Sequence, residues 1–191
     1  GLVEIRPGHG AYVRPLANDV LTPAMVGLFP RHRSALYDFL EFRREQEAFA
    51  AHFAAQRATS QDLLTLENLL DEMVRAHAES EPQREAQIDM RFHVAIIEAA
   101  HNSTLVHVMR SVYDAMSKGV IYSRDHLYKG PGNRPKLLLQ HQEICAAIRA
   151  RDPIAAADAA TRHLDFVISA LRDSDEQDRR EEIARKRAPF L

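Results

Sequence analysis

One carboxylate and three imidazoles are the side chains of this sequence best placed to act together. Asp89 and His93 are four residues apart in QIDMRFHVAII, whose apolar spacing is helical, so both project from one helix face. His141 and His163 each lie on the apolar side of a later helical segment. Carboxylate oxygens and imidazole nitrogens are ligands for first-row divalent metals, zinc above all. The four residues therefore predict a metal site inside a helical core.

The same spacing is also compatible with a simpler interpretation. The chain has ten histidines, and some will fall four residues from another polar residue on a helix by chance. Ordinary hydrogen bonds satisfy a buried histidine as well as a metal does. Asp89 argues for an ion, because an inward-facing carboxylate is costly unless it is paired or bound to a cation. From spacing alone, both interpretations stay open.

Helical periodicity begins near residue 33 and continues to the end of the chain. Six helices are expected, with starts near residues 33, 59, 82, 103, 135 and 153. Thr59 and Asp62 resemble a capping box, Pro82 suits a first helical turn, and Asp152 with Pro153 is an N-cap followed by proline. The pattern predicts an all-α fold, an antiparallel bundle of about six helices.

The sequence also predicts details of these helices. The fourth helix is expected to reach toward Tyr128, and Asn102 is expected to cap the junction before it. The sequence DSDEQDRREEIARKR near the end predicts either a charged helical extension or a frayed tail. The apolar side of the first helix is expected to carry Leu36, Phe39, Leu40, Phe49 and Phe53.

Residues 1–14 follow a different pattern. Extended segments on either side of Pro7-Gly8-His9-Gly10 predict a β-hairpin. A two-stranded hairpin is marginal in water by itself, so we expect it to belong to a larger module. The chain begins at Gly1 without an initiator methionine, and we expect the rest of that module to precede it. Residues 15–32, which contain three prolines, are expected to form a linker.

Composition excludes several classes of protein. The net charge of -2 leaves no overall basic surface for nucleic acid. No apolar stretch is long enough to span a bilayer, and no signal peptide opens the chain. A single cysteine, Cys145, rules out an intrachain disulfide and lies on an apolar helix face, where a buried hydrophobic residue is expected. We therefore expect a cytoplasmic protein without membrane contact.

Three segments resemble the effector-binding FCD domain of FadR-type regulators in the GntR superfamily. They are LYDFLEFRREQEAFAAHFAA, DMRFHVAIIEAAHNSTL and LLLQHQEICAAIRARDPIAAADAATRHL, within about residues 33–172. The opening GLVEIRPGHGAYV is similar to the wing hairpin that ends the preceding winged helix-turn-helix. The resemblance implies a wing remnant at 1–14, a linker at 15–32, an effector-binding domain at 33–172 and a charged tail at 173–191.

The resemblance also implies a metal site. Metal-binding members of this family share a D-x3-H, H and H pattern. A divalent metal is implied, zinc first, with nickel or manganese as alternatives. The pattern falls on Asp89, His93, His141 and His163.

An effector site is implied beside the metal. Arg43 matches a family position where an arginine points into the cavity, and its planar donor fork suits a carboxylate. From spacing alone, Arg43 is better explained as a surface pair with Glu47. The stretches EAAHN and VIYSRDHLY resemble regulators that respond to lactate, pyruvate or glycolate, and the second makes Ser123 and Arg124 weaker effector-binding candidates.

Three functions are compatible with these features. The first is a homodimeric transcription regulator that binds operator DNA through its N-terminal domain and a small carboxylate at the metal. The second is a metal-dependent enzyme acting on a small 2-oxo or 2-hydroxy acid. We expect no enzyme, because the sequence offers no second carboxylate near the metal to act as a general base. The third is a structural dimerisation domain stapled by the metal.

Overall fold

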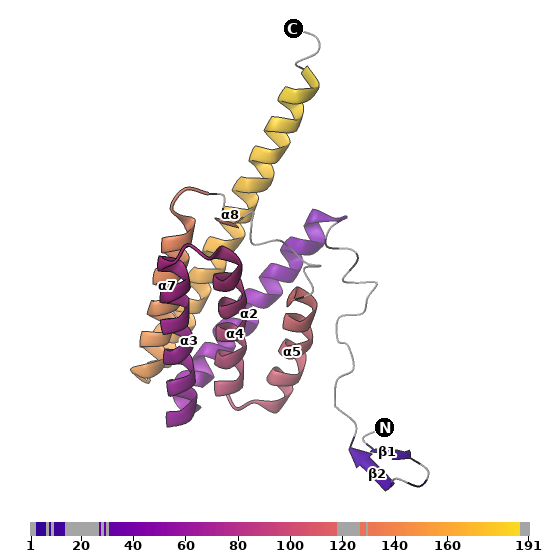
Figure 1. Ribbon diagram of the computed structural model, residues 1–191, viewed down its shortest axis with the longest axis vertical. Helices are drawn as coiled ribbons and strands as arrows, with labels where there is room; N and C mark the ends of the chain where they lie inside the picture. The colour runs from indigo at the N-terminus through magenta and orange to yellow at the C-terminus, as the bar shows by residue number, and fades with distance from the viewer. Residues whose placement is uncertain are drawn as a thin grey trace.

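The computed structural model describes residues 3–6, 8, 10–13, 27, 29, 31–117, 127–128 and 130–187. Within these residues the fold is a helical bundle with one β-hairpin (Figure 1). The predicted all-α bundle of about six helices is confirmed. None of the described helices is long and apolar enough to cross a membrane. The elements are β1 (Val3–Arg6), β2 (Gly10–Val13), α2 (Arg33–Arg57), α3 (Ser60–Ala78), α4 (Pro82–Ala99), α5 (Ser103–Ser117), α7 (Asn133–Arg149) and α8 (Pro153–Arg187).

The two strands form an antiparallel pair, in which Val3 lies opposite Val13 and Arg6 opposite Gly10. Gly8 and Gly10 have φ angles of 77° and 93°, which glycine adopts without the steric cost that a Cβ would add. The assignment of this hairpin to a winged helix-turn-helix stays a prediction. Of the predicted linker, residues 15–26, 28 and 30 lie outside the described part of the chain.

Helices α2 and α8 pack against each other along much of the bundle. The two helices run antiparallel. Tyr37 forms a hydrogen bond with Asp175 at 2.7 Å, and Arg44, which is later in α2, forms one with Asp165, which is earlier in α8, at 2.6 Å. Small side chains on both helices let their axes approach closely. The buried alanines are Ala50, Ala51, Ala54 and Ala55 on α2 and Ala156, Ala159, Ala160 and Ala170 on α8.

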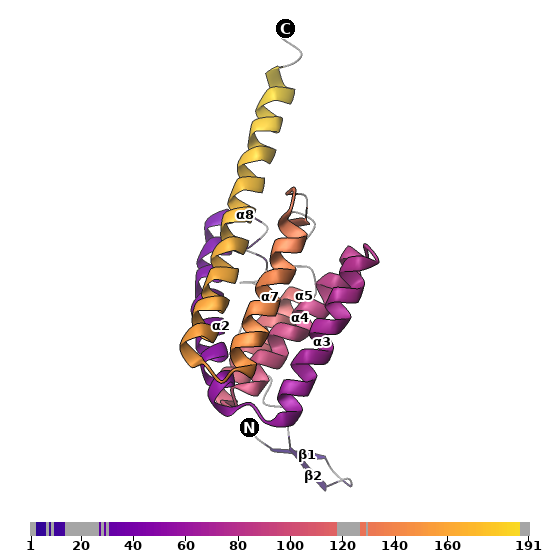
Figure 2. The same ribbon diagram turned by 90° about the vertical axis from the view of Figure 1, so that its left-hand side faces the viewer.

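The remaining helices enclose a centre next to this pair. Helix α4 packs on α2, α3 and α5, and α7 packs on α8, α3 and α2. Figure 2 shows α2 and α8 at one side of the bundle, α3 at the other, and α4, α5 and α7 between them. Side chains from α2, α4, α7 and α8 therefore point into a common interior.

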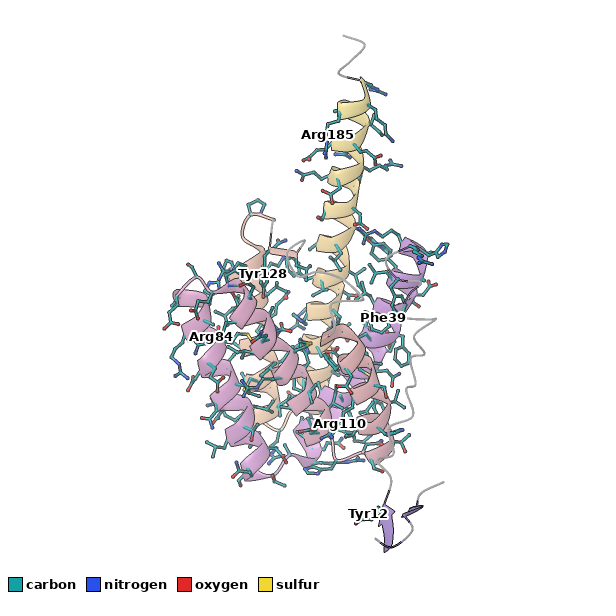
Figure 3. All side chains as sticks on the ribbon, turned by 45° about the vertical axis from the view of Figure 1, so that its right-hand side comes forward. Tyr12, Phe39, Arg84, Arg110, Tyr128 and Arg185 are labelled. Atoms are coloured by element: carbon teal, nitrogen blue, oxygen red, sulfur yellow. The ribbon has the colours of Figure 1, made fainter. Side chains whose placement is uncertain are left out.

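Helix α8 continues beyond the bundle. It remains helical to Arg187, and Arg185 lies on the projecting part (Figure 3). Of the two alternatives for this sequence, the charged helical extension is the one observed. Ion pairs four residues apart, Glu182 with Lys186 at 2.6 Å among them, support a helix that has no apolar face to bury.

The structure tests two further expectations, the inward position of Phe49 on α2 and the cap at Asn102 before α5. Phe49 was expected on the inward side of α2, but 44% of it is exposed, and its ring packs edge-on against Phe53 at the surface. Alanines rather than phenylalanine occupy the inward positions at this level, where α8 lies close. The predicted cap at Asn102 is confirmed, because its Oδ1 accepts a hydrogen bond from the Leu105 amide at 3.1 Å.

The fourth helix was expected to continue toward Tyr128. The structure describes α5 from Ser103 to Ser117. Residues 118–126 lie outside the described residues, so the course of the chain up to Tyr128 stays a prediction.

A capping box holds the first turn of α3. Thr59 Oγ1 accepts from the Asp62 amide at 3.2 Å, and Asp62 accepts in return from the Thr59 amide at 2.7 Å. We expect Thr59→Ala to lower the free energy of unfolding by about 1 kcal/mol, because one of these bonds is lost. The loss is measurable by urea denaturation.

The matched control for this change is Thr65→Ala, an exposed threonine within the same helix. Alanine is the better helix former, so this variant should be as stable as the parent protein or more stable. Equal losses in both variants would contradict the role assigned to the capping box.

Candidate metal centre

The four predicted metal ligands meet in the interior of the bundle. Helix α4 supplies Asp89 and His93, α7 supplies His141 and α8 supplies His163. At most 2% of each of these residues is exposed. Residues that are far apart in the sequence thus share one buried location.

The ring nitrogens of the three histidines face one another. One nitrogen from each of His93, His141 and His163 lies within 4.8 Å of the others, and the Nε2 atoms of His93 and His141 are 3.3 Å apart. Two nitrogens that bind one tetrahedral metal at the usual zinc distance are separated by about 3.3–3.4 Å. The His93–His141 pair therefore already has this spacing, and the triad supplies three imidazole donors that could hold a divalent metal.

Asp89 brings a carboxylate to the same nitrogens. Its Oδ1 lies 3.1 Å from His141 Nε2, and its Oδ2 lies 3.7 Å from His93 Nε2. Asp89 and His93 are one helical turn apart on α4, so the carboxylate and the ring project from the same face. A carboxylate in this place supplies an oxygen ligand and offsets part of the charge of a cation.

Hydrogen-bond acceptors behind the rings orient two of the imidazoles. Gln140 Oε1 lies 3.1 Å from His163 Nδ1, and Glu47 Oε2 lies 2.6 Å from His93 Nδ1. An acceptor at Nδ1 selects the tautomer whose Nε2 lone pair is available to a metal. The edge of Phe92 packs against the ring of His141, with the centroids 5.4 Å apart. These contacts restrict the orientations of the three rings around the centre.

His163 is held in the neutral form that binds metals. Burial lowers its pKa well below the usual value for histidine, and the neighbouring His141 and His93 lower it further. A neutral imidazole offers a lone pair, whereas a protonated one does not.

Arg43 lies beside this cluster, and its environment differs from the surface pair expected from spacing. Only 1% of it is exposed, so it is not part of a surface pair. Its guanidinium forms an ion pair with Glu47, and its Nη2 donates to the Tyr113 hydroxyl at 2.9 Å. The pairing with Glu47 is therefore present, but it is buried. Whether Arg43 contacts an effector stays a prediction.

Glu47 was missed as part of the site. Glu47 is a second carboxylate that contacts His93 directly. The expectation was that no second carboxylate near the metal can act as a general base, so the ionisation of Glu47 decides whether it holds. The signal was available in the sequence: Arg43 and Glu47 fall in helical register with the buried Leu36, Leu40 and Ala50 on the inward face of α2. Polar residues at such positions require partners in the core.

The ionisation of Glu47 argues against a catalytic role for it. Burial alone would raise its pKa, but electrostatic interaction with Arg43 and His93 and the hydrogen bonds from His93 and Tyr113 lower it to about 2. A carboxylate with so low a pKa is a weak general base near neutral pH. Glu47 is thus suited to holding its neighbours rather than to removing a proton from a substrate.

The other two effector-binding candidates are not placed by the structure. Ser123 and Arg124 lie outside the described residues. Their assignment stays a prediction.

Comparison with known proteins agrees with this architecture. The family model described as FCD domain matches residues 38–166. The chain is 36% identical over 184 residues to the Escherichia coli (strain K12) protein named "Putative L-lactate dehydrogenase operon regulatory protein", covering 94% of this chain and 70% of that protein. It is 32% identical over 179 residues to the "Glc operon transcriptional activator" of the same organism, covering 91% and 69%.

A solved structure shares the fold. The structure named "Streptococcus agalactiae GntR" superimposes with a TM-score of 0.68 at 23% identity, and the match covers 88% of this chain and 75% of that one. At this level of identity the similarity concerns the fold alone.

Metal loading should stabilise the protein. An ion that binds only the folded state at a hundred times its Kd adds about 2.7 kcal/mol to the free energy of unfolding. For a chain of this size, that raises the thermal midpoint by roughly 5–11 °C. We expect this shift when zinc, nickel or manganese is added to chelator-treated protein, as followed by circular dichroism.

The matched variants for the metal shift are Asp89→Asn at the site and Asp158→Asn on the exposed surface of α8. The first should lose at least half of the stabilisation by metal, because it removes the anionic ligand, and the second should keep all of it. A parent protein that none of the three metals stabilises would contradict the metal centre.

Proposed function

The chain belongs to the FCD domain family, and from this premise we propose that it is the effector-binding part of a metabolite-responsive transcription regulator. The family and the relatives named above are transcriptional regulators rather than enzymes. In our proposal a divalent metal, zinc first, binds Asp89, His93, His141 and His163. A small carboxylate of the lactate, pyruvate or glycolate class then binds to this metal and changes the affinity for operator DNA.

The buried convergence of three imidazoles and a carboxylate is the observation that carries this proposal. These residues account for at most four metal ligands, and an ion that accepts five or six ligands keeps positions for water or an anion. A 2-hydroxy or 2-oxo carboxylate can occupy two such positions through its carboxylate and its α-oxygen. Nickel and manganese, which accept six ligands, are alternatives to zinc.

The charges of the described residues favour an anionic effector. Arg43 carries one positive charge, and Glu47 and Asp89 each carry one negative charge. A divalent ion leaves this buried group with a positive charge in excess, and a carboxylate would neutralise it. Arg43 is the candidate donor to that carboxylate, together with Ser123 and Arg124.

A hollow lies close to this group. Tyr113, whose hydroxyl contacts Glu47, also lines a groove of about 680 Å³ between α3, α4 and α5. Met90 and Val94 form part of the apolar lining of the groove.

The DNA-binding function belongs to a winged helix-turn-helix at the N-terminal side in our proposal. The hairpin of β1 and β2 would be its wing, residues 15–32 the linker, residues 33–172 the effector-binding domain and residues 173–191 a charged tail. Two recognition helices reading two half-sites would require a homodimer. Such a regulator would act in the cytoplasm.

Carboxylate binding should depend on the metal. We expect one or more of lactate, pyruvate and glycolate to raise the thermal midpoint of metal-loaded protein and to leave chelated protein unchanged. Arg43→Lys should weaken this response about tenfold in effector concentration, because it loses one charge-assisted hydrogen bond while keeping the charge that pairs with Glu47. Equal shifts with and without chelator would contradict the metal-centred pocket.

Effector binding should also change DNA affinity. In the full-length regulator, measured by fluorescence anisotropy on its operator, the active carboxylate should change the Kd by about 5–150-fold. Asp89→Asn should lose this response and Asp158→Asn should keep it. An operator affinity that none of the three acids changes would contradict the regulatory function. Conversion of the acid by metal-loaded protein would support the alternative, a metal-dependent enzyme.

A further inference from the structure

A buried polar group on α2 and α5 has no place in the set of metal ligands. It consists of Arg43 and Glu47 on α2 and Tyr113 on α5, which are 1%, 4% and 3% exposed. Charged residues buried to this degree require a reason, because removing them from water is costly. The contact between this group and His93 provides one.

The two oxygens of Glu47 serve different neighbours. Oε2 lies 2.6 Å from His93 Nδ1, whereas Oε1 accepts from the Tyr113 hydroxyl at 2.5 Å and from the Arg43 guanidinium. With both oxygens engaged, the carboxylate has one orientation. Tyr113 also stacks nearly parallel to the His93 ring, at an angle of 18° and a centroid distance of 6.2 Å.

This arrangement decides which nitrogen of His93 faces the metal site. An ionised carboxylate can only accept, so Nδ1 must carry the proton that is shared with Glu47. The lone pair is then on Nε2, which is the atom that lies 3.3 Å from His141 Nε2. Carboxylates behind metal-bound histidines orient the ring and make the coordinating nitrogen more basic.

We propose that Glu47 is the positioning residue of the metal centre and that it ties the centre to α2. This inference rests on the proposed function, because it presupposes that the histidines bind a metal. The four proposed ligands lie on α4, α7 and α8, and the contact of Glu47 with His93 adds α2 to this set. A change in the position of His93 therefore acts directly on α2, the helix that follows the predicted linker.

Substitution of Glu47 by glutamine tests the proposal. Glu47→Gln keeps the size of the side chain and removes the anionic acceptor behind His93. We expect the metal affinity, measured by competition with a chromophoric chelator, to fall about 10–100-fold. The visible absorption spectrum of bound Co²⁺ should change as well, since the electron donation of one ligand is altered. The matched control is Glu45→Gln, an exposed glutamate on the same helix that pairs with Arg44, and it should leave both readouts unchanged.

The substitution Glu47→Gln also deprives Arg43 of its ion-pair partner, and a second variant separates this effect from the effect on His93. Glu47→Gln leaves a buried guanidinium without its counter-charge, which weakens folding with or without metal. The double variant Arg43→Gln/Glu47→Gln removes both charges of the pair at once, so that no unpaired charge remains. It should show the same 10–100-fold loss of metal affinity. It takes the place of the single variant if that protein does not fold.

The outcomes separate this inference from the proposed function. A parent protein that binds no divalent metal contradicts the metal centre itself. A parent protein that binds metal, with variants that bind it equally well and show an unchanged Co²⁺ spectrum, overturns the role of Glu47. A lower stability of the metal-free protein without any change in metal affinity would assign Glu47 a purely structural role and would equally overturn the proposal.

Discussion

The charges buried at the centre of the bundle are the constraint on which the rest of the structure depends. Helices α2, α4, α7 and α8 bring two carboxylates, one guanidinium and three imidazoles into a location where at most 4% of any of these residues is exposed. Each group must be satisfied by its neighbours or by an ion, because water is excluded. Glu47 has hydrogen-bonding and charged partners in Arg43, Tyr113 and His93. Asp89 and the three histidines lie close enough together to offer ligands to a cation.

The packing around this centre follows from that requirement. Alanines along α2 and α8 let these two helices lie close together, so that Glu47 and His163 reach the same interior. The helical register of α4 places Asp89 and His93 one turn apart, which aims a carboxylate and a ring at one point. The helices of the bundle thus bring polar side chains together at its centre, and apolar residues surround them.

The sequence predicted much of this arrangement, for identifiable reasons. Helix starts were visible because proline and capping residues mark them, and the four converging residues were visible because imidazoles on apolar faces are unusual. Glu47 was missed because its pairing with Arg43 is equally expected on a helix surface. The orientation of Phe49 was missed because helical spacing alone does not reveal where a neighbouring helix leaves room only for alanine. Distances between ring nitrogens depend on tertiary packing, which no local pattern contains.

The metal centre is the central claim, and anomalous X-ray diffraction tests it most directly. A crystal grown with zinc and a small 2-hydroxy acid would be measured at the zinc absorption edge. We expect an anomalous peak about 2.0–2.1 Å from Nε2 of His93, His141 and His163, with an Asp89 oxygen and the acid completing the coordination. A crystal without a peak among these residues, or with the acid bound away from the ion, would contradict it.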